Sequence, residues 1–179
     1  MMNKRTLIVF MSCALISGSA FAEDNAATLN VTGALNGSAA TCTLALDHTV
    51  AELGQAALNM LPYIGSSSQD VKTQDAYFVN FLGEGCAQDN YGVKFIGATD
   101  ESGQALANSF TGEGAAEGIA VNIYDAQGSI ITPNTGVEQV YEEIYHRHFP
   151  FYLAMAKRAD RDSRAGNVQA SLTVEMVRL

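Results

Sequence analysis

The feature that most constrains this chain is a two-residue period in its apolar residues. It is clearest in the last segment, where every second residue is apolar: Val168, Ala170, Leu172, Val174 and Met176. Alternation of this kind places one set of side chains on each face of a strand, as in a half-buried sheet. Patterns with helical spacing are scarce. The chain is therefore expected to be all-β.

Earlier segments repeat the same period. Apolar residues alternate at Tyr77, Val79 and Phe81, at Val93 and Phe95, at Ile119, Val121 and Ile123, and at Phe149, Phe151, Leu153 and Met155. Pro150 interrupts the last of these, and a proline cannot donate to a ladder, so an edge strand or a bulge is expected there. About seven short strands at even spacing indicate one β-sandwich of immunoglobulin-like kind.

The amino terminus has the organisation of an export signal. Lys4 and Arg5 precede a ten-residue apolar run from Leu7 to Ile16, and Ala20-Phe21-Ala22 follows as a cleavage pattern. We interpret residues 1–22 as a signal peptide. The alternative is a membrane anchor, for which the run is short.

Removal of these 22 residues leaves two cysteines, Cys42 and Cys86. In an oxidising compartment an even pair is most simply a disulfide, and two buried free thiols are the alternative. A crosslink over this span contributes about 4 kcal/mol in the chain-entropy model.

Charge and motifs exclude several classes of function. The chain has 10 Lys+Arg against 19 Asp+Glu, a formal net charge of −9, which argues against nucleic acid as a partner. No phosphate loop, serine-nucleophile motif or Cys-x-x-Cys occurs. His146-x-His148 supplies only half of a zinc site, so a secreted metal-dependent enzyme is a minor hypothesis. We expect no catalytic residues, no metal and no cofactor.

One further strand pattern lies between the cleavage site and the first cysteine. Leu29, Val31, Gly33 and Leu35 share one face of an extended segment. A strand outside the region closed by the cysteines can pair within its own sandwich, or it can leave and pair with another molecule. The sequence alone does not decide between the two.

The chain resembles the subunits of type 1-like chaperone–usher pili in the order of its features. These are the signal peptide, the alternating arm, Cys42, Cys86 and the closing strand. In that family the arm carries a row of apolar residues broken by one small residue, which Gly33 matches. Gly166 stands fourteenth from the carboxyl end, where the family has glycine. The segment His148–Leu153 resembles the family's Pro-Phe-containing strand beside its groove.

The resemblance implies an all-β fold, an incomplete immunoglobulin-like sandwich (the pilin fold) completed by a donor strand. Residues 23–37 would be the donor-strand extension and residues 38–179 the pilin domain. The donor face would be Leu29, Val31, Gly33 and Leu35. The acceptor groove or chaperone contact would be formed by the strands that carry Phe149, Phe151, Leu153, Val168, Leu172, Val174 and Met176.

The implied function is a structural fimbrial subunit assembled by donor-strand exchange and supporting cell adhesion. Its implied partners are a periplasmic chaperone, an outer-membrane usher and other subunits joined head to tail, with room for a host-surface receptor. The expected location is the surface fimbrium of a Gram-negative bacterium, reached through the periplasm.

One departure from the family pattern concerns the last residues. Arg178 stands where the family usually has an aromatic residue, so a minor or divergent subunit is expected rather than an abundant shaft subunit. Shaft repeat, adaptor and terminator remain open. The alternative function is a self-sufficient secreted receptor-binding β-sandwich, which would leave no exposed apolar trough and would hold residues 29–35 in its own core.

Overall fold

A computed structural model describes residues 28–33, 42–87, 91–140, 148–160 and 162–179. The proposed signal peptide, Leu35 of the donor face and His146 lie outside the described residues.

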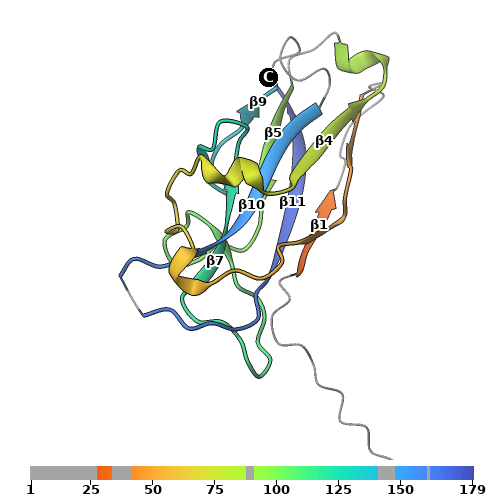
Figure 1. The fold of residues 1–179 in the computed structure, drawn as a ribbon. Helices are drawn as coiled ribbons and strands as arrows, with labels where there is room; N and C mark the ends of the chain where they lie inside the picture. Colours follow the sequence, from red (N-terminus) through yellow and green to blue (C-terminus); the bar gives the residue numbers. More distant parts are fainter. Residues whose placement is uncertain (1–27, 34–41, 88–90, 141–147, 161) are drawn as a thin grey trace, which may run out of the picture.

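The described chain forms two packed β-sheets (Figure 1). The first, here the β11 sheet, has the order β3-β1-β11-β5-β9, with β3 (Val50–Glu52), β1 (Thr28–Gly33), β11 (Gln169–Arg178), β5 (Tyr91–Ile96) and β9 (Glu138–Gln139). The second, the β10 sheet, has the order β2-β4-β10-β7-β6, with β2 (Thr43–Leu46), β4 (Ala76–Leu82), β10 (His148–Lys157), β7 (Ile119–Tyr124) and β6 (Leu106–Ala107). β8 (Ile130–Ile131) pairs with β7. Three short 3-10 helices lie in the connections between the described strands. They are η1 (Leu58–Met60) and η2 (Asp70–Thr73), between β3 and β4, and η3 (Glu84–Ala87), between β4 and β5.

The core lies between the two sheets, as the alternation predicts. Along β4, β10 and β11, the buried side chains recur at every second position over most of each strand. An aromatic cluster joins the sheets: the Phe95 ring of β5 lies 5.2 Å from that of Phe151 and 6.0 Å from that of Phe149, both on β10. The expected all-β, immunoglobulin-like class is confirmed.

The expectation from Pro150 holds in part, because the proline lies at a local edge among the described strand pairs although β10 as a whole is not an edge strand. β10 is an interior strand, between β4 and β7, and no bulge is needed to place the proline. β4 pairs with residues 148–152 and β7 with residues 152–157, so Pro150 lies in the half of β10 that β7 does not pair. A missing backbone N–H is tolerated where one side of a strand has no ladder.

β7 is buried on both faces, although its sequence alternates between apolar and mixed residues. Asn122 is fully buried because a loop covers the second face. Its side-chain amide donates to the carbonyl oxygen of Tyr63 (3.0 Å) and to the hydroxyl of Tyr124 (2.8 Å), and its carbonyl oxygen accepts from the N–H of Gly65 (3.2 Å). The Asn122 side chain is therefore one of the links that hold the loop around residues 63–65 on the sheet.

Candidate donor-strand groove

The amino-terminal strand β1 occupies a place in the sheet of its own chain. It lies between β3 and β11 (Figure 1). It runs parallel to β11, with Leu29 opposite Ala170, Val31 opposite Leu172 and Gly33 opposite Val174. With β3 it is antiparallel. Of the two options that the sequence left open, the described chain adopts pairing within its own sandwich.

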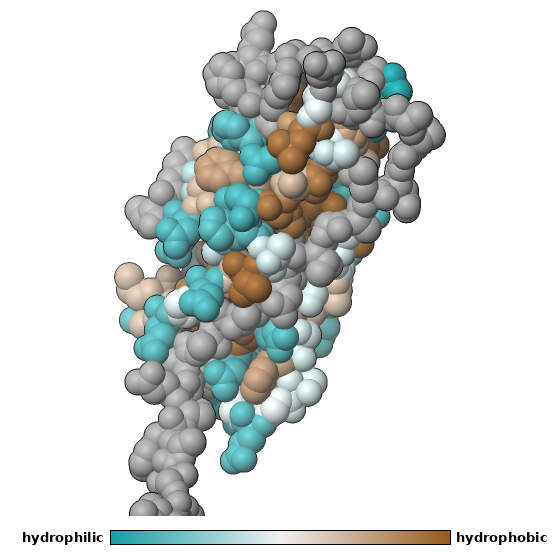
Figure 2. All heavy atoms as spheres, turned by 90° about the vertical axis from the view of Figure 1, so that its right-hand side faces the viewer, coloured by the Kyte–Doolittle hydropathy of each residue, from teal (hydrophilic) through white to brown (hydrophobic). Residues whose placement is uncertain are grey.

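The sandwich that the resemblance implies to be incomplete is completed, in the described chain, by its own strand β1. Without β1, the β11 sheet would lack the strand between β3 and β11. On the face turned toward the viewer in Figure 2, apolar residues of the described chain gather in the upper half, with hydrophilic residues beside them. Val50 and Leu82 are among the large apolar side chains that stay exposed.

Every second position of β1, namely Leu29, Val31 and Gly33, pairs with a buried position of β11. Ala170, Leu172 and Val174 all have exposed fractions of 1% or less. Because side chains of directly opposed residues lie on the same face of a sheet, a strand in this register aligns one set of its positions with the core. This set is the one that contains Leu29, Val31 and Gly33.

The sequence analysis placed the acceptor edges on β10 and β11, and the sheet order corrects one of them. β3, not β10, is the second neighbour of β1. β10 lies in the opposite sheet, where Phe149, Phe151 and Leu153 are buried in the common core cluster. These three side chains form part of the core beneath the β11 sheet and supply no backbone edge to β1.

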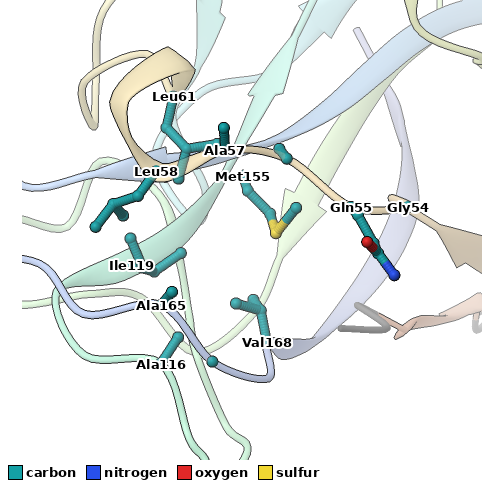
Figure 3. Close-up of a pocket in the computed structure, with 12 residues that line it drawn as sticks. Gly54, Gln55, Ala57, Leu58, Leu61, Ala116, Ile119, Met155, Ala165 and Val168 are labelled. Atoms are coloured by element: carbon teal, nitrogen blue, oxygen red, sulfur yellow. The ribbon is translucent and has the colours of Figure 1, made fainter. Parts of the chain in front are cut away.

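A cavity of about 400 Å³ lies at the end of the sheet where β1 begins (Figure 3). Thr28 pairs with Gln169, the first residue of β11, and the buried Val168 just before that strand lines this cavity. Gly54 and Gln55, which follow β3, line the other side, and Met155 of β10 reaches between them. We call it the Val168 pocket. The lining side chains are mostly small or aliphatic, while polar atoms make up about half of the exposed wall.

Gly166 lies at the same end of β11, and its surroundings explain why glycine is needed. A Cβ atom there would lie 2.3 Å from the carbonyl oxygen of Gly114 and 2.6 Å from the nitrogen of Ala116. The backbones are held together by hydrogen bonds from the N–H of Asn167 to Gly114 (2.8 Å) and from Ala116 to the carbonyl of Asn167 (3.0 Å). Gly166 thus permits two backbone segments to meet beside the Val168 pocket.

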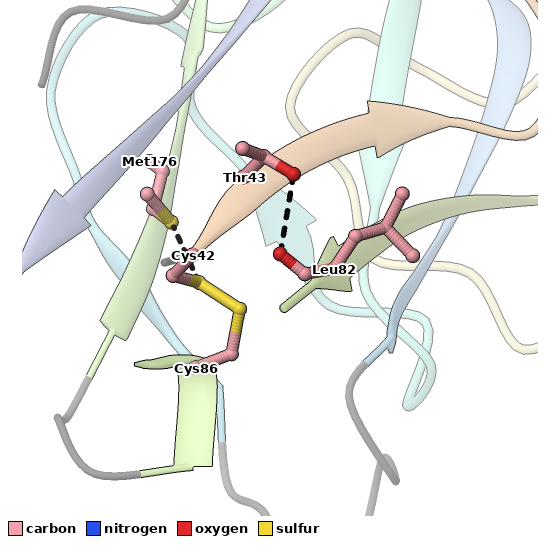
Figure 4. The surroundings of a disulfide bond; sticks show 5 residues. All are labelled: Cys42, Thr43, Leu82, Cys86 and Met176. Atoms are coloured by element: carbon pink, nitrogen blue, oxygen red, sulfur yellow. Dashed lines mark hydrogen bonds between the residues drawn. A yellow bond between two sulfur atoms is a disulfide. The ribbon is translucent and has the colours of Figure 1, made fainter. Parts of the chain in front are cut away.

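The predicted disulfide between Cys42 and Cys86 is confirmed (Figure 4). It joins the residue before β2 to η3, which follows β4. The Sδ atom of Met176 lies 3.7 Å from the Sγ atom of Cys42. A disulfide sulfur carries no hydrogen, so this is a packing contact, which joins the crosslink to the carboxyl-terminal half of β11. Met176 itself is partly buried.

The sequence analysis also named His148 and Arg178, which the structure describes, and His146, which it does not. His148 packs edge-on against the Phe78 ring at 5.3 Å. Within the described residues, no group of three His, Cys, Asp or Glu side chains could hold a metal ion. Arg178 pairs with Tyr91 on β5, and Leu179 is exposed.

Sequence reasoning missed two parts of this site. β3 has only three residues, and nothing in their pattern marks it as an edge beside β1. The segment Gly54–Ala57 that walls the Val168 pocket consists of small and polar residues. Neither carries a periodic signal, so only the folded arrangement identifies them.

Three features define a pilin domain: two packed sheets of immunoglobulin-like kind, a disulfide between the segments that flank β2 and β4, and an amino-terminal strand beside the last strand. The fimbrial protein family matches residues 29–177. The long polar fimbria protein A of Salmonella typhimurium strain LT2 is 29% identical over 140 residues, which cover 74% of this chain and 74% of that protein. This chain belongs to the fimbrial protein family.

Membership of the family gives the chain its function as a structural subunit of a fimbrium, a surface fibre built from such subunits. Across the described residues, none of the helical segments has the length and hydropathy needed to cross a membrane.

Proposed function

We propose that this subunit joins its neighbours by donor-strand exchange, with residues 23–37 of one copy completing the domain of the next. The observation that carries the proposal is the place of β1 between β3 and β11. This strand precedes Cys42 and lies outside the loop that the disulfide closes. A second copy of the same segment could occupy the same position without breaking any other strand pair.

The energetics favour a persistent joint. Backbone pairing on both sides supplies the ladder, and apolar side chains at alternating positions contribute about 1.5–3 kcal/mol each when fully buried. The donor positions are Leu29, Val31, Gly33 and Leu35. The acceptor is the β3–β11 gap, with Val168 just before β11, Leu172 and Val174 on β11, and the aromatic residues of β10 beneath. Met176 lies near the far end of the same strand.

The Val168 pocket extends this acceptor. It is bordered by the residues that follow β3 and by those that precede β11, which are the two neighbours of β1. In the register of β1, a longer donated strand would bring Ala27 opposite Val168, which lines the pocket. The pocket therefore supports a donor segment that reaches beyond the six residues of β1.

The proposed route begins with export. Residues 1–22 act as the signal peptide, a periplasmic chaperone lends a strand to the domain, and the outer-membrane usher exchanges it for the arm of the next subunit. Arg178 near the carboxyl end supports a minor or divergent subunit. No catalytic step is involved.

The second candidate function is a self-sufficient secreted receptor-binding module. The pairing of β1 within its own chain favours it, because a self-filled sandwich needs no partner strand. Cooperative unfolding of a stable monomer that never polymerises would be its signature.

Deletion of residues 23–35 separates the two candidates. The experiment expresses the deleted and intact chains with their chaperone and usher, and fibres are counted by electron microscopy. We expect no fibres from the deleted chain and undiminished capture by the chaperone. Fibres that contain the deleted chain at the intact level would overturn the donor assignment.

A further inference from the structure

A ridge of exposed apolar side chains lies apart from β1, at residues 58–63, which we call the Met60 ridge. Met60 has an exposed fraction of 77% and Tyr63 one of 52%, while Leu58 and Leu61 pack against the core. Most large apolar residues of the described chain are buried, so two exposed ones three positions apart stand out. Tyr and Met are also enriched in the contact regions of protein interfaces.

The ridge is held rigidly. The backbone of Lys157 on β10 donates to the carbonyl of Pro62 and accepts from the N–H of Ile64, both at 2.9 Å. Its ammonium group donates to the carbonyls of Leu58 (3.3 Å) and Asn59 (3.4 Å). Buried Asn122 holds the carbonyl of Tyr63 from within. Because little ordering remains, a partner would meet a preformed surface.

The ridge also separates two hollows. On one side is the Val168 pocket, which Leu58 and Leu61 line. On the other is a shallow depression of about 530 Å³ beside Tyr63, bordered by Lys157, Asp162 and Ser163. The Met60 ridge is therefore continuous with the end of the proposed acceptor groove, where a neighbouring subunit would enter.

The charge around the ridge fits a second copy of this acidic chain. The whole sequence has a net charge of −9, so two copies repel wherever acidic surfaces meet. Beside the ridge the signs are mixed: Arg158 pairs with Glu101 at 2.8 Å and with Asp160 at 2.9 Å. Lys157 lies 5.3 Å from the centre of the Tyr63 ring. Repulsion between copies is smallest where opposite charges already balance.

We infer that the Met60 ridge is a contact surface for a neighbouring copy of this subunit, additional to the donated strand. The inference rests on the proposed function, because the Met60 ridge adjoins the end of the groove that would receive the donated strand. Met60 and Tyr63 would be the residues that the neighbour covers, and the shallow depression would receive part of its surface.

The test places a photo-crosslinking benzoylphenylalanine at position 60 of the full chain, in fibres assembled with chaperone and usher. The matched control carries it at Leu82, which has a similar size and an exposed fraction of 53%. We expect crosslinks between two copies to be about tenfold more frequent from position 60. Equal yields from the two positions, or crosslinks from position 60 only to other proteins or to glycans, overturn the inference.

A second measurement tests the Met60 ridge independently of whether donor-strand exchange occurs. If no fibres form from the unmodified chain, the proposed function fails, and the soluble chain is examined by sedimentation velocity. Self-association about tenfold weaker in the Met60→Asp, Tyr63→Asp double variant supports the ridge as a contact. Unchanged self-association, or none in the unmodified chain, overturns it.

Discussion

Gly166 and Gly114 are in backbone contact: a Cβ atom on Gly166 would lie 2.3 Å from the carbonyl oxygen of Gly114. The contact joins the segment before β11 to the loop of residues 112–116. Because both neighbours are backbone, no flexible side chain can move aside to make room.

Substitution of Gly166 by alanine is therefore expected to destabilise the domain. The loss should be about 1–3 kcal/mol, the range for overpacked sites. Chemical unfolding measures it. Gly136→Ala is the matched control, because the nearest atom to its added Cβ is a side-chain oxygen of Glu138 at 3.7 Å. Equal midpoints for the two variants would show that the close approach costs nothing.

The disulfide should supply a large part of the stability. Cys42 and Cys86 are 44 positions apart, and loss of a native disulfide from a small secreted domain typically costs about 2–5 kcal/mol. Urea unfolding with and without reductant measures this difference. The double variant Cys42→Ser, Cys86→Ser should be as unstable as the reduced chain and insensitive to reductant. A reductant-insensitive midpoint in the unmodified chain would contradict the prediction.

Asn122→Ala should loosen the loop that carries Tyr63 and Gly65. The substitution leaves the carbonyl of Tyr63 and the N–H of Gly65 without their side-chain partner, at about 1–3 kcal/mol for each group that stays dry. Tyr124→Phe is the control, because it removes only the hydrogen bond from the amide to the hydroxyl. We expect a smaller loss of stability and little change in limited proteolysis for Tyr124→Phe. Similar effects of the two changes would show that the loop does not depend on Asn122.

Stability should depend on pH through Glu138 on β9. Burial, and secondarily the nearby charge of Asp125, raises the pKa of this carboxyl above its ordinary value. A folded-state pKa above the unfolded one favours folding at low pH, and this contribution is lost as the pH rises through the folded pKa. Glu138→Gln should therefore gain stability relative to the unmodified chain at pH 7, and the gain should shrink toward pH 4. Thermal unfolding of both chains across this range is the measurement. A gain that grows toward low pH would contradict the assignment.

Much of the sandwich could be predicted because its strands carry their own signal. The alternation on β4, β10 and β11 reports which side chains face the core, and each strand is long enough for the period to be recognised. The cysteine pair followed from its number and from the expected compartment. These properties are local or depend on composition.

The neighbours of β1 could not be predicted in the same way. Strand order depends on which edges meet in space, and the three residues of β3 have too short a pattern to be recognised. The sequence therefore indicated an acceptor groove beside β11 but assigned its second edge to β10. Gly166 illustrates the same limit. The family resemblance marks its position, but glycine is required there because the backbone of residues 114–116 leaves no room for a Cβ atom.

The most direct test of strand donation measures whether residues 23–37 can complete the domain as a separate molecule. The oxidised chain that lacks these residues is unfolded in urea with increasing amounts of a peptide of residues 23–37. A peptide with Val31→Asp serves as the control, because it places a charge opposite Leu172.

We predict that the truncated chain alone unfolds at low urea and that its midpoint rises with peptide concentration, as binding to the folded state requires. The Val31→Asp peptide should have little effect. A truncated chain as stable as the full chain, with a midpoint that neither peptide changes, would contradict the account.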